Sequence, residues 1–359
     1  MNPFFSDIHK NFGFGFMRLP MVEGRVDIPQ VTAMVDEFLA RGFNYFDTAH
    51  GYLDGKSELA LRECLTSRYP RDRYILTDKL SGHFFETREE IVPLFEKQLA
   101  ACGVDYFDFY LMHAMSHDRY VRFKELGVPE VLQALKDQGK IRHIGMSFHD
   151  TAAVLDEILT DCPAIEVVQI QFNYLDFEDE KVQSRACYEV CRRHGKPVLV
   201  MEPVKGGSLV NLPQAGQRVF DRLGGSSNAS YAIRFAAGFE GMMMVLSGMS
   251  TLEQLRDNVS FMEDFQPLAP REMEAVETVR AIIRNQGLIG CTGCRYCTEV
   301  CPQGIPIPEL FAGVNEKRNG GSPADAAAFE CLKCGKCEEI CPQKLNIREL
   351  LVVAEQELG

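Results

Sequence analysis

The sequence predicts a (β/α)₈ barrel over residues 1–285, followed by a small, mostly α-helical domain over residues 286–359. In the first part, eight short apolar runs alternate with helical periods over about 260 residues, as eight βα units require. Near residues 286–290 the composition changes to closely spaced cysteines. The length of 359 residues also suits one large domain and one small one.

The eight apolar runs have the length and the residue types of buried parallel strands. An open doubly wound sheet is the alternative architecture. It would usually carry a GxGxxG turn after its first strand, and the sequence has none there. The predicted strands are residues 12–19, 44–49, 74–80, 106–114, 141–148, 166–173, 197–204 and 242–249.

Helical patterns fill the intervals between the predicted strands. Apolar residues recur at helical spacing over 28–39 and over 91–102, and the glycines that follow, Gly42 and Gly103, suit left-handed helix ends. Thr87-x-x-Glu90 and Ser250-x-x-Glu253 have the spacing of capping boxes. Residues 205–230 are rich in Gly, Ser, Asn and Gln, which predicts a long functional loop after the seventh strand.

The bulk properties exclude some classes of function. A formal net charge of −13 argues against a nucleic-acid or anionic-membrane partner, because both need a basic surface. There is no apolar run of roughly 20 residues, so we expect no membrane span. The first residues lack the pattern of a signal peptide, and the clustered cysteines do not suit a disulfide framework. These features predict a cytoplasmic protein.

Eight of the 13 cysteines lie in two runs with the same spacing, C-x₂-C-x₂-C-x₃-C-P, within residues 291–302 and 331–342. In such runs the first three thiolates bind one [4Fe–4S] cluster and the fourth binds the other. Zinc is the alternative metal, but its sites usually use paired C-x₂-C hooks far apart in sequence. The predicted ligand sets are Cys291, Cys294, Cys297 and Cys341 for the first cluster, and Cys331, Cys334, Cys337 and Cys301 for the second.

This cysteine region resembles the two-cluster ferredoxins over about 60 residues. The helical joiner between the runs suggests the α-helical variety that is fused to redox enzymes. The five remaining cysteines, which lie outside the two runs, are expected to pack in the core as small apolar residues.

Four polar residues follow or end the early predicted strands. Asp47 lies in the second strand and Tyr52 follows it, Lys79 ends the third and His113 ends the fourth. Each could have a purely structural role when taken singly. In a barrel, however, the carboxyl ends of the strands meet at one mouth, so we expect the four side chains to form one site.

The pattern D-T-A-x-x-Y, then a strand-ending Lys and a strand-ending His, resembles the aldo-keto reductase superfamily. The pieces IRHIGMSFH, VVQIQFNY, MEPVKGGSL and SGMSTLEQLRDN agree in order, and the resemblance covers roughly residues 12–284. It implies a nicotinamide cofactor and reversible carbonyl–alcohol conversion. The resemblance implies that Tyr52 donates the proton and that Lys79 lowers the pKa of Tyr52. Asp47 would hold Lys79, and His113 would orient the carbonyl.

The resemblance also implies cofactor contacts. Ser147 and Gln169 would hold the nicotinamide amide, with Phe148 replacing a usual Asn, and no stacking tyrosine is present at residues 201–204. The positions of a 2′-phosphate clamp fall on Gly248 and Gln254, and neither is basic, so NADPH lacks support in the sequence. The remaining predicted contacts are Lys205, Gly206, Gly207, Ser208 and Leu209 for the pyrophosphate, and Met249, Ser250 and Asn258 for the adenosine end.

The sequence therefore predicts an iron–sulfur oxidoreductase that acts on a small carbonyl or alcohol. NAD(P)H is the expected cofactor. FMN is the alternative, because it can link two-electron and one-electron steps. A ferredoxin-type protein is the expected electron partner. Two other functions stay open: a nicotinamide enzyme whose clusters are only structural, and a non-catalytic electron-transfer subunit.

Overall fold

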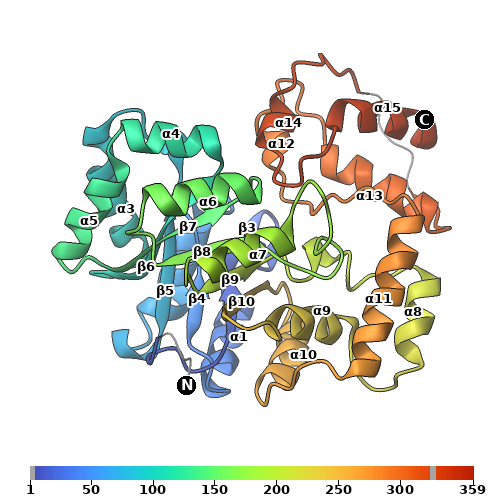
Figure 1. Cartoon of the computed structure of the whole chain (residues 1–359), viewed down its shortest axis with the longest axis horizontal. Helices are drawn as coiled ribbons and strands as arrows, with labels where there is room; N and C mark the ends of the chain where they lie inside the picture. Colours follow the sequence, from blue (N-terminus) through green and yellow to red (C-terminus); the bar gives the residue numbers. More distant parts are fainter. Residues whose placement is uncertain (1–4, 324–328) are drawn as a thin grey trace. The chain divides into compact units, whose positions relative to one another are not determined.

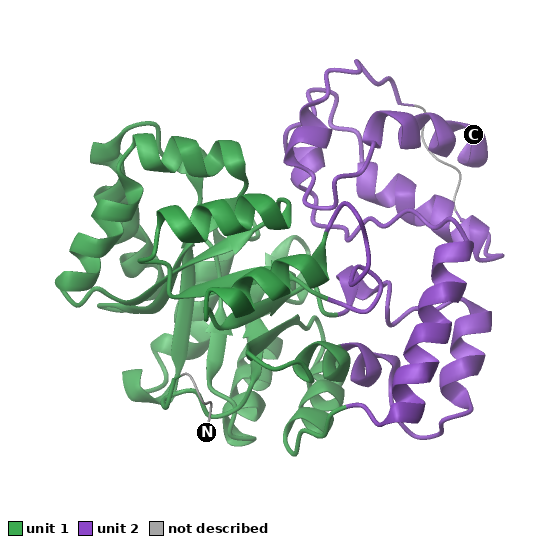
Figure 2. Ribbon diagram, in the orientation of Figure 1, with its two compact units in different colours: residues 1–172, 183–203, 233–267 green, residues 173–182, 204–232, 268–359 purple. Residues whose placement is uncertain are grey.

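The computed structural model describes residues 5–323 and 329–359. The chain forms two compact units, shown in green and purple in Figure 2. Unit 1 comprises residues 1–172, 183–203 and 233–267, and unit 2 comprises residues 173–182, 204–232 and 268–359. Residue 285, the predicted domain boundary, lies inside unit 2 and not between the two units. The boundary between the barrel domain and the cysteine domain stays a prediction.

Unit 1 contains the predicted barrel. Eight parallel strands close in the order β1-β10-β9-β8-β7-β6-β5-β4, and β1 pairs with both β10 and β4. The closed sheet confirms the (β/α)₈ prediction and excludes the open sheet. The strands are β1 (Phe12–Gly15), β4 (Tyr45–Asp47), β5 (Ile75–Leu80), β6 (Phe107–Met115), β7 (Ile141–Phe148), β8 (Val167–Gln171), β9 (Val198–Met201) and β10 (Met242–Gly248).

Helices follow the strands and lie outside them, as Figure 1 shows for α3, α5 and α6. A short antiparallel hairpin, β2 (Met21–Val22) and β3 (Arg25–Val26), precedes the first of these helices. The helices of the barrel are α1 (Ile28–Ala40), α2 (Lys56–Leu61), α3 (Ile91–Cys102), α4 (His117–Glu125), α5 (Val128–Asp137), α6 (Ala152–Asp161), α7 (Ser184–Arg193), α9 (Asn228–Ala237) and α10 (Leu252–Met262).

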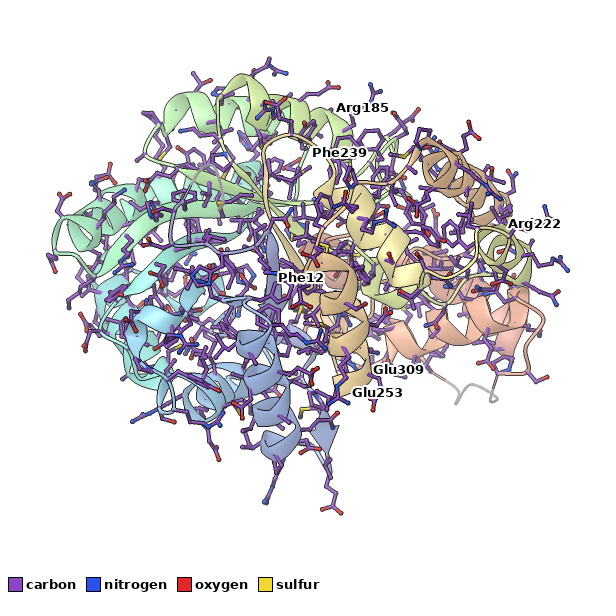
Figure 3. All side chains as sticks on the ribbon, turned by 90° about the horizontal axis from the view of Figure 1, so that it is seen from below. Phe12, Arg185, Arg222, Phe239, Glu253 and Glu309 are labelled. Atoms are coloured by element: carbon purple, nitrogen blue, oxygen red, sulfur yellow. The ribbon has the colours of Figure 1, made fainter. Side chains whose placement is uncertain are left out.

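Aromatic side chains supply much of the packing between the strands and these helices. Phe12 of β1 is fully buried, and its ring centroid lies 6.2 Å from that of Phe38 in α1. Phe239, labelled with Phe12 in Figure 3, packs edge-on against Phe172 with centroids 5.0 Å apart. Such pairs bury large apolar areas and stabilise the barrel.

The predicted helix boundaries are confirmed in part. Thr87 and Glu90 form the expected capping box before α3, and Gly103 ends that helix with a left-handed backbone. The second capping box is wrong by one residue: Thr251 caps α10, because the Ser250 hydroxyl donates instead to the Arg18 carbonyl at 2.7 Å. The predicted long loop after the seventh strand is interrupted by a helix, α8 (Gln214–Asp221).

Unit 2 is mostly helical. Its apolar core includes three of the cluster cysteines together with Ile307, Phe311, Val314 and Leu351, among other residues. Within residues 5–323 and 329–359, no helix has both the length and the apolar character that crossing a membrane requires. Besides α8, the helices of unit 2 are α11 (Pro270–Asn285), α12 (Tyr296–Glu299), α13 (Ile307–Arg318), α14 (Lys336–Ile340) and α15 (Ile347–Leu358).

Candidate functional site

The carboxyl ends of β4 and β5 bring Asp47 and Lys79 together, as predicted. The Lys79 ammonium donates to Asp47 Oδ1 at 2.6 Å and to the Thr48 carbonyl at 2.7 Å. The two side chains are 6% and 1% exposed, so this is a buried ion pair. Burial raises the pKa of Asp47, and the Lys79 charge opposes that rise. Because its charge is paired in the interior, Lys79 has a fixed position.

Tyr52 lies in the loop after β4, with its ring beside Lys79. The Lys79 Nζ is 4.8 Å from the centroid of the Tyr52 ring, which is a cation–π geometry. The expected lowering of the Tyr52 pKa is not observed. Burial raises that pKa well above 10, and the charges of Asp47, Asp78 and Glu202 add to the rise. Tyr52 therefore keeps its proton at neutral pH and can give it only to a stronger base.

His113 reaches the same neighbourhood from β6. Its ring centroid lies 5.8 Å from that of Tyr52, with the planes 76° apart. Burial and the nearby Lys79 charge lower the pKa of His113 well below its usual value, so the imidazole is neutral. The Ser81 hydroxyl lies 2.5 Å from His113 Nδ1. If this hydroxyl donates, the ring proton is on Nε2, where it can reach a substrate oxygen.

The backbone next to His113 is unusual. Ala114 has φ of 57°, and the pairing of β6 with β7 shifts register between Met112 and Met115. A bulge of this kind re-aims the side chains beside it, and such strain is typical of functional positions. The Ala114 amide donates to Ser147 Oγ at 2.6 Å, so the bulge is tied to β7.

Ser147 and Gln169, the two predicted nicotinamide contacts, are register partners on β7 and β8. Their side chains are 1% and 3% exposed. Ser147 Oγ accepts one hydrogen bond, and its hydroxyl proton remains able to donate to a ligand. The pair thus offers the donor and acceptor groups that a carboxamide needs, which fits the predicted role.

The predicted pyrophosphate loop, Lys205–Leu209, is part of unit 2 and is occupied by local contacts. The Gly207, Ser208 and Leu209 amides donate within the loop, at 3.0 to 3.2 Å. The Lys205 ammonium binds Asp176 at 2.7 Å and Gln343 at 2.9 Å. These bonds remove donors that the phosphate role would need, so the loop's contribution to cofactor binding stays a prediction without structural support.

This loop instead packs on the first cysteine run. Gly206 has φ of 62°, and a Cβ at that position would come within 2.3 Å of the Thr292 carbonyl oxygen. Only glycine fits so close to the backbone between Cys291 and Cys294.

The predicted adenosine contacts lie where β10 leads into α10, in unit 1. The Ser250 amide donates to Gln254 Oε1 at 2.7 Å, and Asn258 donates to Ser247 at 3.0 Å. Gly248 lies against the Arg18 side chain, and Met249 is buried. The nearby Arg256 is paired with Glu37 at 2.9 Å. The five predicted residues are therefore brought together at the start of one helix.

In unit 2 the cluster cysteines line two cavities. Ile307, at the start of α13, lines both. Each cavity contains three cysteines of one run and the last cysteine of the other, which is the crossed arrangement that the spacing predicts. The first cavity has Cys291, Cys294, Cys297 and Cys341, and the second has Cys301, Cys331, Cys334 and Cys337.

The chemistry of the first set fits a metal cluster. Burial raises the pKa of the Cys297 thiol to about 12, and the neighbouring Cys294, Cys291 and Cys341 add to that rise. Four thiolates this close together require a compensating cationic group, as bound iron provides. Both runs also direct an amide at a sulfur: Gly293 N lies 3.4 Å from Cys291 Sγ, and Lys333 N lies 3.4 Å from Cys331 Sγ.

Three residues near the mouth were not predicted from the sequence. Ser81 contacts His113, and the buried carboxyl groups of Glu58 and Asp78 lie behind Lys79. Asp78, directly before Lys79, was the one signal in the sequence for such a buried carboxyl group, because a buried strand rarely carries an aspartate.

Comparison with known families and proteins identifies the family of the barrel and of the cysteine region. The model of the aldo/keto reductase family matches residues 11–281, and that of the 4Fe-4S dicluster domain matches residues 290–345. L-galactose dehydrogenase of Arabidopsis thaliana is 25% identical over 292 residues, which cover 76% of this chain and 89% of that protein. NADH-specific methylglyoxal reductase of Escherichia coli K12 is 26% identical over 190 residues, 47% of this chain and 54% of that protein.

Solved structures share the fold. An aldo-keto reductase from Klebsiella pneumoniae in complex with NADPH superposes with a TM-score of 0.61 at 19% identity, over 75% of this chain and 90% of that one. The holo form of an aldo-keto reductase from Bacillus halodurans superposes with a TM-score of 0.60 at 23% identity, over 76% of this chain and 92% of that one. The chain belongs to the aldo/keto reductase family and carries a C-terminal 4Fe-4S dicluster domain.

Proposed function

We propose that the protein is an oxidoreductase that interconverts a small carbonyl compound and its alcohol at the barrel mouth, with electrons exchanged through two [4Fe–4S] clusters. The observation that carries the first part is the arrangement of Tyr52 next to the buried Lys79–Asp47 pair, with neutral His113 beside it. A proton donor, a fixed cation and a neutral hydrogen-bond donor are the groups that carbonyl reduction needs.

The proposed roles follow from the charges. A nicotinamide cofactor, when bound, supplies the hydride. His113 donates a hydrogen bond to the carbonyl oxygen and orients it, while Tyr52 holds the proton that this oxygen receives. The raised pKa of Tyr52 is compatible with this role, because an alkoxide is a far stronger base than a phenolate. Lys79 then stabilises the phenolate that remains.

Nicotinamide is the preferred cofactor. Ser147 and Gln169 suit its carboxamide, and the solved relative from Klebsiella pneumoniae is described with NADPH bound. The Escherichia coli relative is described as NADH-specific, which agrees with Gly248 and Gln254 at the positions of a 2′-phosphate clamp. We therefore propose NADH over NADPH. FMN has no support among these relatives.

The two clusters would occupy the two four-cysteine cavities, and a [4Fe–4S] cluster supplies single electrons. Complete ligand sets for two clusters support electron exchange, for which we propose a ferredoxin-type partner. A second candidate is a purely structural role. It is favoured by Cys297, Cys337 and Cys341, which are part of the apolar core of unit 2.

The test compares two tyrosine variants on anaerobically purified protein. Methylglyoxal is a suitable first carbonyl, because one relative is named for reducing it. We expect Tyr52→Phe to lower kcat by about 10²–10⁴-fold with the iron content unchanged. Tyr106→Phe, just before β6 at the opposite end of the strand from His113, is the matched control and should keep its activity. Full activity of Tyr52→Phe would contradict the proposal.

The same preparations separate the two roles of the clusters. If the clusters exchange electrons with substrate, chelating the iron under mild conditions abolishes ferredoxin-driven reduction but leaves reduction by NADH. If the clusters are structural, loss of iron unfolds unit 2, and ferredoxin never drives the reaction even with iron present.

A further inference from the structure

Two buried carboxyl groups behind the mouth have no role in the proposed chemistry. Glu58 of α2 is 1% exposed, and Asp78 of β5 is fully buried and directly precedes Lys79. A carboxyl oxygen of each lies within 4.8 Å of the other and of Cys102 Sγ.

Two carboxylates in contact in the protein interior cannot both be ionised, because burial and repulsion both disfavour the second charge. Burial raises the pKa of Glu58 to about 7. Burial and the Glu58 charge together raise the pKa of Asp78 well above its usual range. Above the pKa of Glu58 the pair therefore holds one proton and one negative charge.

The surroundings favour a proton over a metal ion at this position. The Cys102 thiol donates a hydrogen bond to Asp78 Oδ2, with the sulfur 3.7 Å from that oxygen. Burial and the two acidic neighbours raise the pKa of Cys102 well above its usual value, whereas a metal ion needs the thiolate. The titratable and charged groups that face the pair are His50 and Tyr52 from the loop after β4, Lys79 from β5, Lys97 and Cys102 from α3, and Tyr110 from β6.

The pair is linked to the mouth through the backbone of Lys79. The Lys79 amide donates to Asp78 Oδ1 at 2.7 Å. On its other side, the Lys79 carbonyl accepts from Gln98 at 3.1 Å, and Gln98 accepts from the Tyr110 hydroxyl at 2.6 Å. Glu58 is held in turn by His50 Nδ1 at 2.9 Å. The residue that carries the fixed cation thus depends on Asp78 for its position.

We propose that Glu58 and Asp78 share one proton and act as positioning residues, and that loss of this proton slows carbonyl reduction. The second negative charge would be buried next to Lys79. It would also make Tyr52 a weaker proton donor, because the Asp78 charge already opposes ionisation of that tyrosine. This inference rests on the proposed function of Tyr52 and Lys79.

The first test is the pH dependence of kcat for methylglyoxal reduction. For the wild type we expect kcat to fall about tenfold per pH unit above the second ionisation of the pair, in which the shared proton is lost. In Glu58→Gln the amide can donate to Asp78 as the shared proton does, so kcat should stay within about twofold of its low-pH value across the same range. Glu63→Gln, on an exposed residue five positions along, is the matched control and should keep the wild-type profile.

The second test is independent of activity. Infrared difference spectra between low and high pH should contain the carbonyl stretch of a protonated carboxylic acid in the wild type and in Glu63→Gln. This band should be missing in Glu58→Gln and in Asp78→Asn. The measurement on the wild type also holds if one of these variants does not fold.

Three outcomes would overturn the inference. Absence of the infrared band in the wild type would exclude the shared proton. A wild-type pH profile in folded Glu58→Gln would exclude its control of the reaction. One extra metal ion per chain, lost in both variants, would show a metal site instead. If the band is present but Tyr52→Phe retains full activity, the shared proton stands and the proposed function fails.

Discussion

The barrel mouth and the cluster region assemble their sites in opposite ways. At the mouth, Asp47, Lys79 and His113 come from three strands and meet only because the sheet closes. In the cluster region, each four-cysteine set comes from two short runs, and three of its members are already neighbours in sequence. The first site is therefore a property of the whole fold, and the second is a property of local spacing.

This difference has a consequence for stability. The buried charges of the mouth are compensated by protein groups, since the Lys79 ammonium binds Asp47 and the Thr48 carbonyl. In the cluster region, burial and the neighbouring sulfurs of Cys294, Cys291 and Cys341 raise the pKa of Cys297 to about 12, so a bound cation is needed to hold its thiolate. We expect the mouth to be sensitive to single side-chain changes and the cluster region to depend on iron.

The largest expected effect comes from breaking the buried pair. Lys79→Met leaves the Asp47 charge alone in the interior, which should lower the free energy of unfolding of the barrel by about 3–5 kcal/mol. Urea unfolding under anaerobic conditions measures this change, and the iron content should not fall. The double variant Lys79→Met with Asp47→Asn should recover most of the loss.

The exposed pair of Lys124 and Asp161 is the matched control for this experiment, because its side chains are 57% and 37% exposed. Lys124→Met should change the unfolding midpoint far less. Equal losses in the two variants would mean that the buried pair has no special role.

The next largest effect tests the crossed ligand sets. Cys341→Ser should remove the cluster of the first run, although Cys341 belongs to the second run. We expect about half of the iron and one of two reduced-cluster signals to be lost. Cys64→Ser, in the buried core of the barrel, is the control and should keep all of the iron. Loss of the cluster bound by Cys331, Cys334 and Cys337 instead would contradict the crossed arrangement.

A smaller effect is expected at Ser81. Removing its hydroxyl in Ser81→Ala frees His113 Nδ1 and lets the imidazole change tautomer, so kcat should fall about tenfold while KM changes little. Ser81→Thr keeps the hydroxyl and should restore most of the activity. If Ser81→Ala raises KM alone, the hydroxyl contributes to binding and not to the orientation of His113.

The last effect is small at any one pH step and concerns the dependence of stability on pH. The pKa of Glu58 rises from 4.5 to about 7 on folding, so the folded state holds more protons between these values. Its contribution to stability therefore falls as the pH rises from about 4.5 through about 7, by at most about 1.4 kcal/mol per pH unit. The difference in unfolding free energy between wild type and Glu58→Gln should show this slope. Parallel curves would exclude it.

Much of the fold followed from sequence because each signal was local and repeated. The apolar runs predicted all eight barrel strands: in the structure seven runs contain the corresponding strand, and the run 106–114 misses only the last residue of β6, Met115. Gly103 marked the end of α3 because a left-handed residue there favours glycine. The shared spacing of the two cysteine runs predicted which four cysteines would line each cavity.

The remaining features depend on contacts between distant segments. Ser81 and His113 are 32 residues apart, and nothing in either local sequence indicates their contact. The rise in the Tyr52 pKa comes from burial and from Asp78 and Glu202, which the pattern D-T-A-x-x-Y does not contain. The Gly-rich loop at Lys205 has the sequence of a phosphate site. Its ion pair with Asp176 and its packing on Thr292 are contacts between distant segments, which the sequence does not indicate.

The most direct test of the account asks whether cluster electrons reach a carbonyl substrate. Anaerobic protein is reduced with dithionite, freed of the reductant, and mixed with methylglyoxal and NAD⁺ while the reduced clusters are followed by electron paramagnetic resonance. We predict that both clusters are reoxidised and that one alcohol forms per chain, since each cluster gives one electron, and that Tyr52→Phe stays reduced. Clusters that stay reduced in wild-type protein, while NADH drives carbonyl reduction at full rate, would contradict the account.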